Sequence, residues 1–129
     1  MVKIAIVEDD AAIAKLYEFQ FKKAGYTVGV ANDGITGLAL CERMKPGLVL
    51  LDLMMPEMSG QEMLEKMRAM DWSSGILVMI LTNLSQREAQ LQLGKSGFDE
   101  YAVKAYYTPK QILEKVNQLL KENNKLPKD

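Results

Sequence analysis

Five segments with the pattern of β-strands alternate along this chain with segments whose apolar residues recur at helical spacing. Four of them are short runs rich in Val, Ile and Leu, at residues 2–7, 26–31, 47–52 and 76–81, and the fifth, at 99–104, is more polar. Short apolar runs of this kind are typical of parallel strands buried on both faces. The alternation therefore predicts an α/β fold, a doubly wound parallel sheet covered by helices on both faces. The run at 76–81 is the most apolar and is expected at the centre, whereas 99–104 suits an edge.

The intervening segments carry start and stop signals for helices. A first helix is expected from Asp10 to Gly25, and a second from the turn sequence at residues 32–34 to the residue before Pro46. Their predicted buried positions are Ile13, Leu16, Tyr17, Phe21 and Ala24 in the first, and Ile35, Leu38, Ala39 and Met44 in the second.

Three further helices are predicted from their N-terminal signals. Ser59 with Glu62, and Ser85 with Glu88, have the spacing of a capping box, and Thr108 precedes Pro109 as an N-cap before a first-turn proline. The helix after Ser85 has few apolar positions and is expected to be weakly held. Residues 1–121 are expected to form one domain, and residues 122–129 a frayed tail.

Length and composition exclude several classes of protein. A chain of 129 residues forms one domain, and no apolar run approaches the length of a membrane span. The net charge of −1 offers no general attraction to nucleic acid, and the absence of histidine excludes histidine-based zinc sites and catalytic triads. The single cysteine, Cys41, is expected to be a buried helix residue. A soluble, cytoplasmic protein that binds neither nucleic acid nor membrane is predicted.

Polar groups with related chemistry follow four of the predicted strands. The carboxylates Glu8 and Asp9 follow the first, Asp52 ends the third, Thr82 ends the fourth and Lys104 ends the fifth. The carboxyl ends of parallel strands meet at one edge of the sheet, so these groups are expected to lie together. Clustered carboxylates without sulfur or imidazole suit Mg²⁺, with Mn²⁺ as an alternative. Such a set fits phosphoryl transfer to an aspartate, Asp52, as the nucleophile.

These residues give the chain a resemblance to the receiver domains of bacterial response regulators. The resemblance extends from Val2 to about Lys121 and rests on the acid pair, on residues 52–56 with Gly60, and on Thr82 and Lys104 in that order. It implies a flavodoxin-like (βα)5 sheet of strand order 2-1-3-4-5, an order that periodicity alone leaves open. It further implies that a sensor histidine kinase or a phosphotransfer protein phosphorylates Asp52. A downstream effector, unknown from this sequence, would read the change.

The resemblance also implies a role for each site residue. Asp9 and Asp52 would bind Mg²⁺ directly, Glu8 through water, and Met54 through its backbone carbonyl. Thr82 and Lys104 would bind the phosphoryl oxygens. Thr82 and Tyr101 would act as the switch that reshapes the fourth and fifth βα units. The only chemistry expected is Mg²⁺-dependent self-phosphorylation and slow autodephosphorylation, so the chain is not expected to be an enzyme.

Plain structural roles compete with some of these assignments. For Asp10 a helix N-cap is preferred to a metal ligand, and Tyr101 alone could be edge-strand packing.

The sequence departs from the family pattern at several positions near the site. Ala105 replaces the proline usual after the lysine, and a trans peptide is expected there because a cis bond before alanine costs about 3 kcal/mol. Asn83 is bulkier than the small residue usual at its position. Met54 and Leu84, at positions that influence the hydrolytic water, are apolar and predict a long-lived phosphoryl group.

Three other functions were weighed. A phosphatase of the haloacid dehalogenase type needs an acid two residues after the nucleophile, where this chain has Met54. A flavin carrier needs a phosphate loop after the first strand, where the acids at residues 8–10 would repel phosphate. A pseudo-receiver that only binds a partner is disfavoured because all five chemical groups are present. The sequence does not identify the output, the cognate kinase or the oligomeric state.

Overall fold

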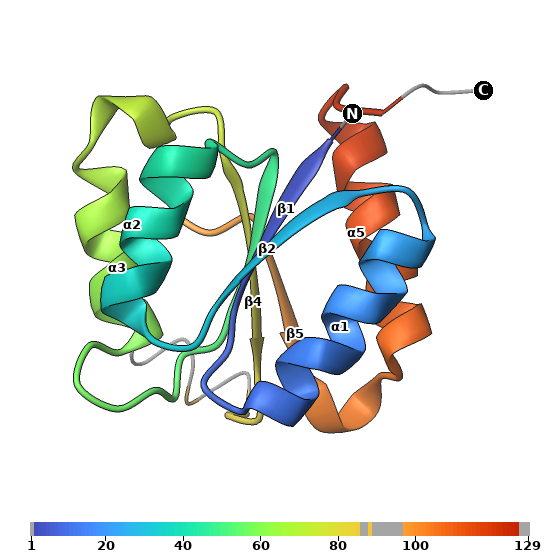
Figure 1. Cartoon of the computed structure of the whole chain (residues 1–129), viewed down its shortest axis with the longest axis horizontal. Coiled ribbons are helices and arrows are strands. Elements are labelled where there is room, and N and C mark those ends of the chain that lie inside the picture. The colour runs from blue at the N-terminus through green and yellow to red at the C-terminus, as the bar shows by residue number, and fades with distance from the viewer. Residues whose placement is uncertain (1, 86–87, 89–96, 127–129) are drawn as a thin grey trace.

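The computed structural model describes residues 2–85, 88 and 97–126. Five parallel strands form one sheet of order β2-β1-β3-β4-β5 (Figure 1). The strands are β1 (Lys3–Val7), β2 (Thr27–Ala31), β3 (Leu48–Leu51), β4 (Leu77–Thr82) and β5 (Glu100–Val103). The predicted fold class and strand order are therefore confirmed.

Four α-helices are described, two on each face of the sheet. They are α1 (Ala11–Lys23), α2 (Gly34–Met44), α3 (Gly60–Arg68) and α5 (Pro109–Glu122), with short 3-10 helices at Asp71–Ser73 and Lys104–Tyr106. Figure 1 shows α1 and α5 on one side of the sheet and α2 and α3 on the other. The predicted fourth helix lies mostly outside the described residues.

The helices begin at the predicted caps. The Asp10 carboxylate accepts hydrogen bonds from the backbone of Ala12 and Ile13, which confirms it as the N-cap of α1. Ser59 caps α3 by accepting from the Glu62 backbone N–H. Thr108 and Gln111 form a reciprocal capping box at the start of α5, where the sequence predicted only the N-cap Thr108.

Side chains alternate between two cores along each central strand. In β1, Ala5 and Val7 pack on the α2–α3 side, whereas Ile4 and Ile6 pack on the α1–α5 side. Both cores are closed by buried helix residues, including Met63 and Phe21. Burial on both faces explains why the strand sequences are continuously apolar instead of alternating.

Two expectations about burial and position were wrong. Leu16 and Ile35, predicted to face the core, are 59% and 54% exposed. Ala24 and Ala39, which were also predicted to be buried, are exposed as well. The most apolar strand, β4, is not the central one, because β3 occupies that place between β1 and β4. Both strands are fully buried, so apolarity alone did not distinguish them.

Some residues of the expected tail contact the rest of the structure. Glu122 is the last residue of α5, and the backbone of Lys125 then donates a hydrogen bond to the Leu120 carbonyl. The Lys125 ammonium donates to the Gly75 carbonyl at 2.6 Å, and Leu126 packs against the α1–α5 core. These contacts reach Leu126, and residues 127–129 lie outside the described part. That residues 122–129 form a tail stays a prediction.

Within the described residues, no helix is both long enough and apolar enough to span a bilayer. Cys41 is buried in α2 as a free thiol, as expected, and burial raises its pKa to about 12. A thiol in this environment stays protonated and unreactive at neutral pH.

Candidate functional site

The site lies where β1 and β3 end, at the carboxyl edge of the sheet. Val7 of β1 pairs with Leu51 of β3, so the residues that follow these two strands emerge side by side. The backbone N–H of Asp52 donates to the Val7 carbonyl at 3.1 Å, and that of Glu8 donates to the Ala31 carbonyl at 3.0 Å. The sheet hydrogen bonding thus continues one residue beyond the strands and fixes both acids.

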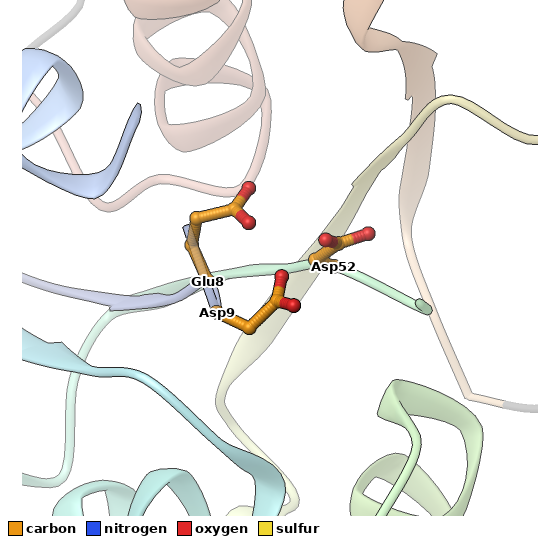
Figure 2. A group of neighbouring side chains, drawn as sticks. All are labelled: Glu8, Asp9 and Asp52. Atoms are coloured by element: carbon orange, nitrogen blue, oxygen red, sulfur yellow. The ribbon is translucent and has the colours of Figure 1, made fainter. Parts of the chain in front are cut away.

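Three carboxylates converge at this edge. Oxygen atoms of Glu8, Asp9 and Asp52 all lie within 4.8 Å of one another, with Glu8 and Asp52 buried and Asp9 exposed. Figure 2 shows the carboxylate of Asp9 directed toward Asp52, with Glu8 beside them. Such a set of hard oxygen donors with one solvent-facing side fits a divalent cation such as Mg²⁺.

Lys104 supplies the positive charge in this cluster. Its ammonium forms ion pairs with Asp52, at 3.0 Å from Oδ2, and with Glu8. Burial alone would lower the pKa of Lys104, but the two carboxylates outweigh that effect and raise it. The lysine therefore remains charged across the neutral range.

The pKa of Glu8 is raised to about 7. Burial is the main cause and the nearby charge of Asp52 adds to it, while the contacts with Lys104 and the Asp10 backbone offset these effects only in part. The charged form of a partly buried carboxyl group next to another carboxylate is stabilised by a cation that binds beside it.

Thr82 and Tyr101 are joined through one residue of the loop after β4. The Thr82 side chain is fully buried, and its hydroxyl oxygen lies 3.5 Å from the Leu84 backbone nitrogen. The Tyr101 hydroxyl donates to the Leu84 carbonyl at 2.5 Å. The Leu84 backbone thus links the two predicted switch residues, a role that residue type does not indicate.

The loop after Asp52 approaches α3 closely. The Met54 backbone N–H donates to Asp52 Oδ1 at 3.2 Å, while the Met54 side chain is 56% exposed. A Cβ atom on Gly60 would lie 2.1 Å from the Asp52 carbonyl oxygen, closer than any real contact allows. Only glycine lets α3 begin against the backbone of the acid, a reason for Gly60 that the sequence did not reveal.

The predicted site residues are thus arranged in two groups. Glu8, Asp9, Asp52 and Lys104 form one contiguous charged cluster. Thr82 and Tyr101 form a second group joined by Leu84. Ala105 follows Lys104 through a trans peptide, as expected, since the described residues contain no cis bond.

Comparison with known proteins identifies the family. The sequence model of the response regulator receiver domain matches residues 4–117. The chain belongs to this family. It is a receiver domain of two-component signalling, the phosphoacceptor module of response regulators.

Relatives of this receiver domain include full-length regulators. It is 35% identical to the DNA-binding dual master transcriptional regulator RpaA of Synechocystis, over 98% of this chain and 52% of that protein. It is 32% identical to the DNA-binding response regulator MtrA of Mycobacterium tuberculosis, over 97% of this chain and 53% of that protein. The chain therefore spans about half the length of these curated relatives.

Solved structures agree in fold. A CheY-like receiver domain protein from Methanospirillum hungatei superimposes with a TM-score of 0.87 at 31% identity, covering 97% of this chain and 98% of that one. The receiver domain of the Francisella response regulator 1452 superimposes with a TM-score of 0.82 at 29% identity, covering 95% and 98%.

Proposed function

We propose that Asp52 is the phosphoacceptor of this receiver domain and that its phosphorylation is the signalling event. The observation that carries the proposal is the cluster itself, in which Asp52 is 5% exposed, adjoins two further carboxylates and contacts the Lys104 ammonium. A carboxylate fixed by the sheet backbone and paired with a cation is a suitably held nucleophile.

In the proposed reaction a carboxylate oxygen of Asp52 attacks the phosphorus of a phosphohistidine. A new O–P bond forms as the P–N bond breaks, and the electron pair of that bond leaves with the imidazole. The donor would be a sensor histidine kinase or a phosphotransfer protein. This sequence contains no histidine, so the phosphohistidine would lie outside it.

The acidic cluster would hold Mg²⁺. Asp9 and Asp52 are the proposed direct ligands, with Glu8 acting through water and Met54 through its backbone carbonyl. The convergence of three carboxylate donors within 4.8 Å supports this assignment. The ion would neutralise charge on the phosphoryl oxygens as they approach the acids.

Lys104 and Thr82 would bind the phosphoryl group. The Lys104 ammonium already lies against Asp52, so it can follow the negative charge from the free carboxylate to the acyl phosphate. The Thr82 hydroxyl would donate a hydrogen bond to a phosphoryl oxygen.

We propose that Thr82 and Tyr101 then report the modification to the surface. A shift of Thr82 toward the phosphate would loosen its contact with the Leu84 backbone, to which Tyr101 is also bonded. The rearranged surface of the fourth and fifth βα units would be read by an effector protein or domain.

Beyond self-phosphorylation and slow autodephosphorylation, no enzymatic reaction is proposed. The free thiol of Cys41 fits a cytoplasmic location.

The test is the intact mass of the protein after incubation with Mg²⁺ and acetyl phosphate. The wild type should gain one phosphoryl group, which hydroxylamine removes and EDTA prevents. Asp52→Asn should gain none. Asp10→Asn is the matched control, because Asp10 lies next to the cluster in sequence but its carboxylate caps α1 instead.

Phosphorylation of the control at the wild-type level would assign the chemistry to the cluster. No gain in wild type, or an equal gain in Asp52→Asn, would contradict the assignment of Asp52. The chain would then be better described as a receiver-like binding module.

A further inference from the structure

Two adjoining hollows lie at the opposite edge of the sheet, where the strands begin. The larger, of about 520 Å³, lies between α1 and the end of α5, and the smaller, of about 320 Å³, lies beside the start of β1. Val2 and Lys125 line both hollows. We call this surface the lysine face, after the four lysines that line it: Lys3, Lys45, Lys121 and Lys125.

The lysine face has an uncompensated positive charge. None of the described residues that line the two hollows is acidic, and none of the four lysines forms an ion pair with a described residue. The whole chain has 16 basic and 17 acidic residues, so the concentration is local and does not follow from composition. A surface of one sign attracts and orients partners of the other sign.

Three of these ammonium groups are held in place by neutral carbonyls. Lys3 donates to the Met44 carbonyl at 3.4 Å, Lys45 donates to the Glu42 carbonyl, and Lys125 donates to the Gly75 carbonyl at 2.6 Å. Lys45 also lies 5.3 Å from the centre of the Trp72 ring. These contacts restrain the side chains without neutralising them, which lowers the entropy cost of binding an anion.

Part of this arrangement has a simpler explanation. Met44 and Glu42 belong to the last turn of α2, where lysines offset the negative end of the helix dipole. That effect accounts for the bonds of Lys3 and Lys45. It does not account for Lys125, whose partner Gly75 lies outside the helices, nor for two acid-free hollows side by side.

The lining of the larger hollow indicates the kind of partner. Besides its two lysines it contains the apolar side chains of Val2, Ala24 and Leu126, and the Tyr26 hydroxyl bonded to Asn117. A compact inorganic anion would use the charges and leave this apolar surface in water. An extended peptide with both acidic and apolar side chains would use both.

We propose that the lysine face binds an extended acidic segment of a partner protein, with its carboxylates at the four lysines and an apolar side chain in the larger hollow. The site would act independently of the Asp52 chemistry, because it lies at the other edge of the sheet. Binding there would leave the acidic cluster open.

The probe is a fluorescein-labelled peptide of alternating glutamate and leucine, and its binding to the full chain is followed by fluorescence anisotropy. The variant with Lys3→Gln, Lys45→Gln and Lys125→Gln should bind about thirtyfold more weakly, since each of the three surface charges contributes on the order of half a tenfold step. A control with Lys15→Gln, Lys66→Gln and Lys110→Gln has the same net charge, on exposed lysines away from the hollows. It should bind within about twofold of wild type.

Amide chemical-shift mapping on the wild type provides a second readout that needs no variant. Peptide should shift the amides of Lys3, Gly47 and Lys125 and leave those of Asp9 and Asp52 in place. Equal weakening in both triple variants, shifts confined to other surfaces, or no binding by the wild type would each overturn the proposal. Lower thermal stability of the first variant with unchanged peptide affinity would leave only the helix-dipole role.

Discussion

Two apolar side chains lie at positions that the resemblance to receiver domains implies influence the water that would hydrolyse the acyl phosphate. Met54 is exposed beside Asp52, and Leu84 is half-buried after Thr82. Neither side chain can hold water by hydrogen bonding strongly enough to orient it for attack on phosphorus. The phosphoryl group is therefore expected to be lost slowly.

Replacing both residues by polar ones, as Met54→Asn with Leu84→Gln, should accelerate that loss by about tenfold, because an oriented water reacts faster. The half-life is measured by intact mass after removal of the phosphodonor. Met70→Asn is a suitable control, since Met70 is also exposed but lies after α3, away from Asp52. An unchanged half-life in the double variant would argue against slow hydrolysis as a property of these side chains.

Asp33 is expected to make the free energy of unfolding depend on pH, and a single substitution can test its contribution. Its carboxylate accepts from the Thr36 backbone N–H at 2.7 Å and from the Thr36 hydroxyl at 2.9 Å, and these bonds lower its pKa from the usual 3.8. A group with a lowered folded-state pKa stabilises the fold above its unfolded pKa, and that contribution is lost as the pH falls through the folded value.

The free energy of unfolding of the wild type should therefore fall more steeply below about pH 3.8 than that of Asp33→Asn, which keeps a cap oxygen but cannot titrate. Urea denaturation at a series of pH values measures both. Parallel curves for the two proteins would show that the Asp33 cap does not couple to protonation.

At the scale of elements, the junction of β3 and α3 depends on Gly60. A methyl group there would meet the Asp52 carbonyl oxygen at 2.1 Å and the Leu53 Cα at 2.8 Å, both backbone atoms that cannot rotate away. Gly60→Ala should lower the free energy of unfolding by about 1 to 3 kcal/mol, the usual cost of overpacking, and slow phosphorylation by displacing Asp52.

Gly75→Ala is the matched control for Gly60→Ala, because nothing lies within 4 Å of the added methyl group. It should change stability and phosphorylation little. Chemical denaturation and acetyl phosphate labelling measure the two effects separately. A Gly60→Ala protein as stable and as reactive as the control would show that α3 can shift without affecting the acid.

The elements also show what the sequence could predict. Caps such as Asp10 and Ser59 are local, since the residue and its partners lie within one turn, and they were located correctly. Leu16 and Ile35 match the helical period as well as buried residues do, and only the tertiary structure leaves them exposed. Strand order is a property of the whole sheet, so the resemblance to a family predicted it and apolarity did not.

The site, too, has some features that the sequence predicts and others that depend on the tertiary structure. The identity of the acids and of Lys104, and their meeting at one edge, could be predicted because strand ends in a parallel sheet share that edge. The contact of Lys104 with both Glu8 and Asp52 depends on side-chain conformation, and the steric role of Gly60 depends on where α3 packs. Neither the contacts of Lys104 nor the steric role of Gly60 can be predicted from residue type or spacing.

At the scale of the whole molecule, the residues after α5 complete the domain. Lys125 connects the end of the chain to Gly75, and Leu126 covers the α1–α5 core. Removing residues 122–129 should lower the free energy of unfolding by about 1 to 2 kcal/mol, because it removes a partly buried leucine and the hydrogen bonds of Lys125 to Leu120 and Gly75.

A second truncation, of residues 127–129 alone, retains these contacts and should be nearly neutral. Thermal and chemical unfolding of the two proteins beside the wild type make the comparison. Equal stability of both truncated proteins would support the prediction of a tail that begins at residue 122.

Val2 and Leu126 line the same hollow. The start of β1 and the end of α5, next to these residues, lie on the side of the molecule opposite the carboxyl ends of the strands (Figure 1). An affinity tag, a fluorophore or a tether to a sensor chip joined near either of these residues would therefore emerge from the side away from the acids. Immobilised through such an attachment, the domain would present its acidic cluster to the solution, where a phosphodonor or a large kinase can approach without steric hindrance.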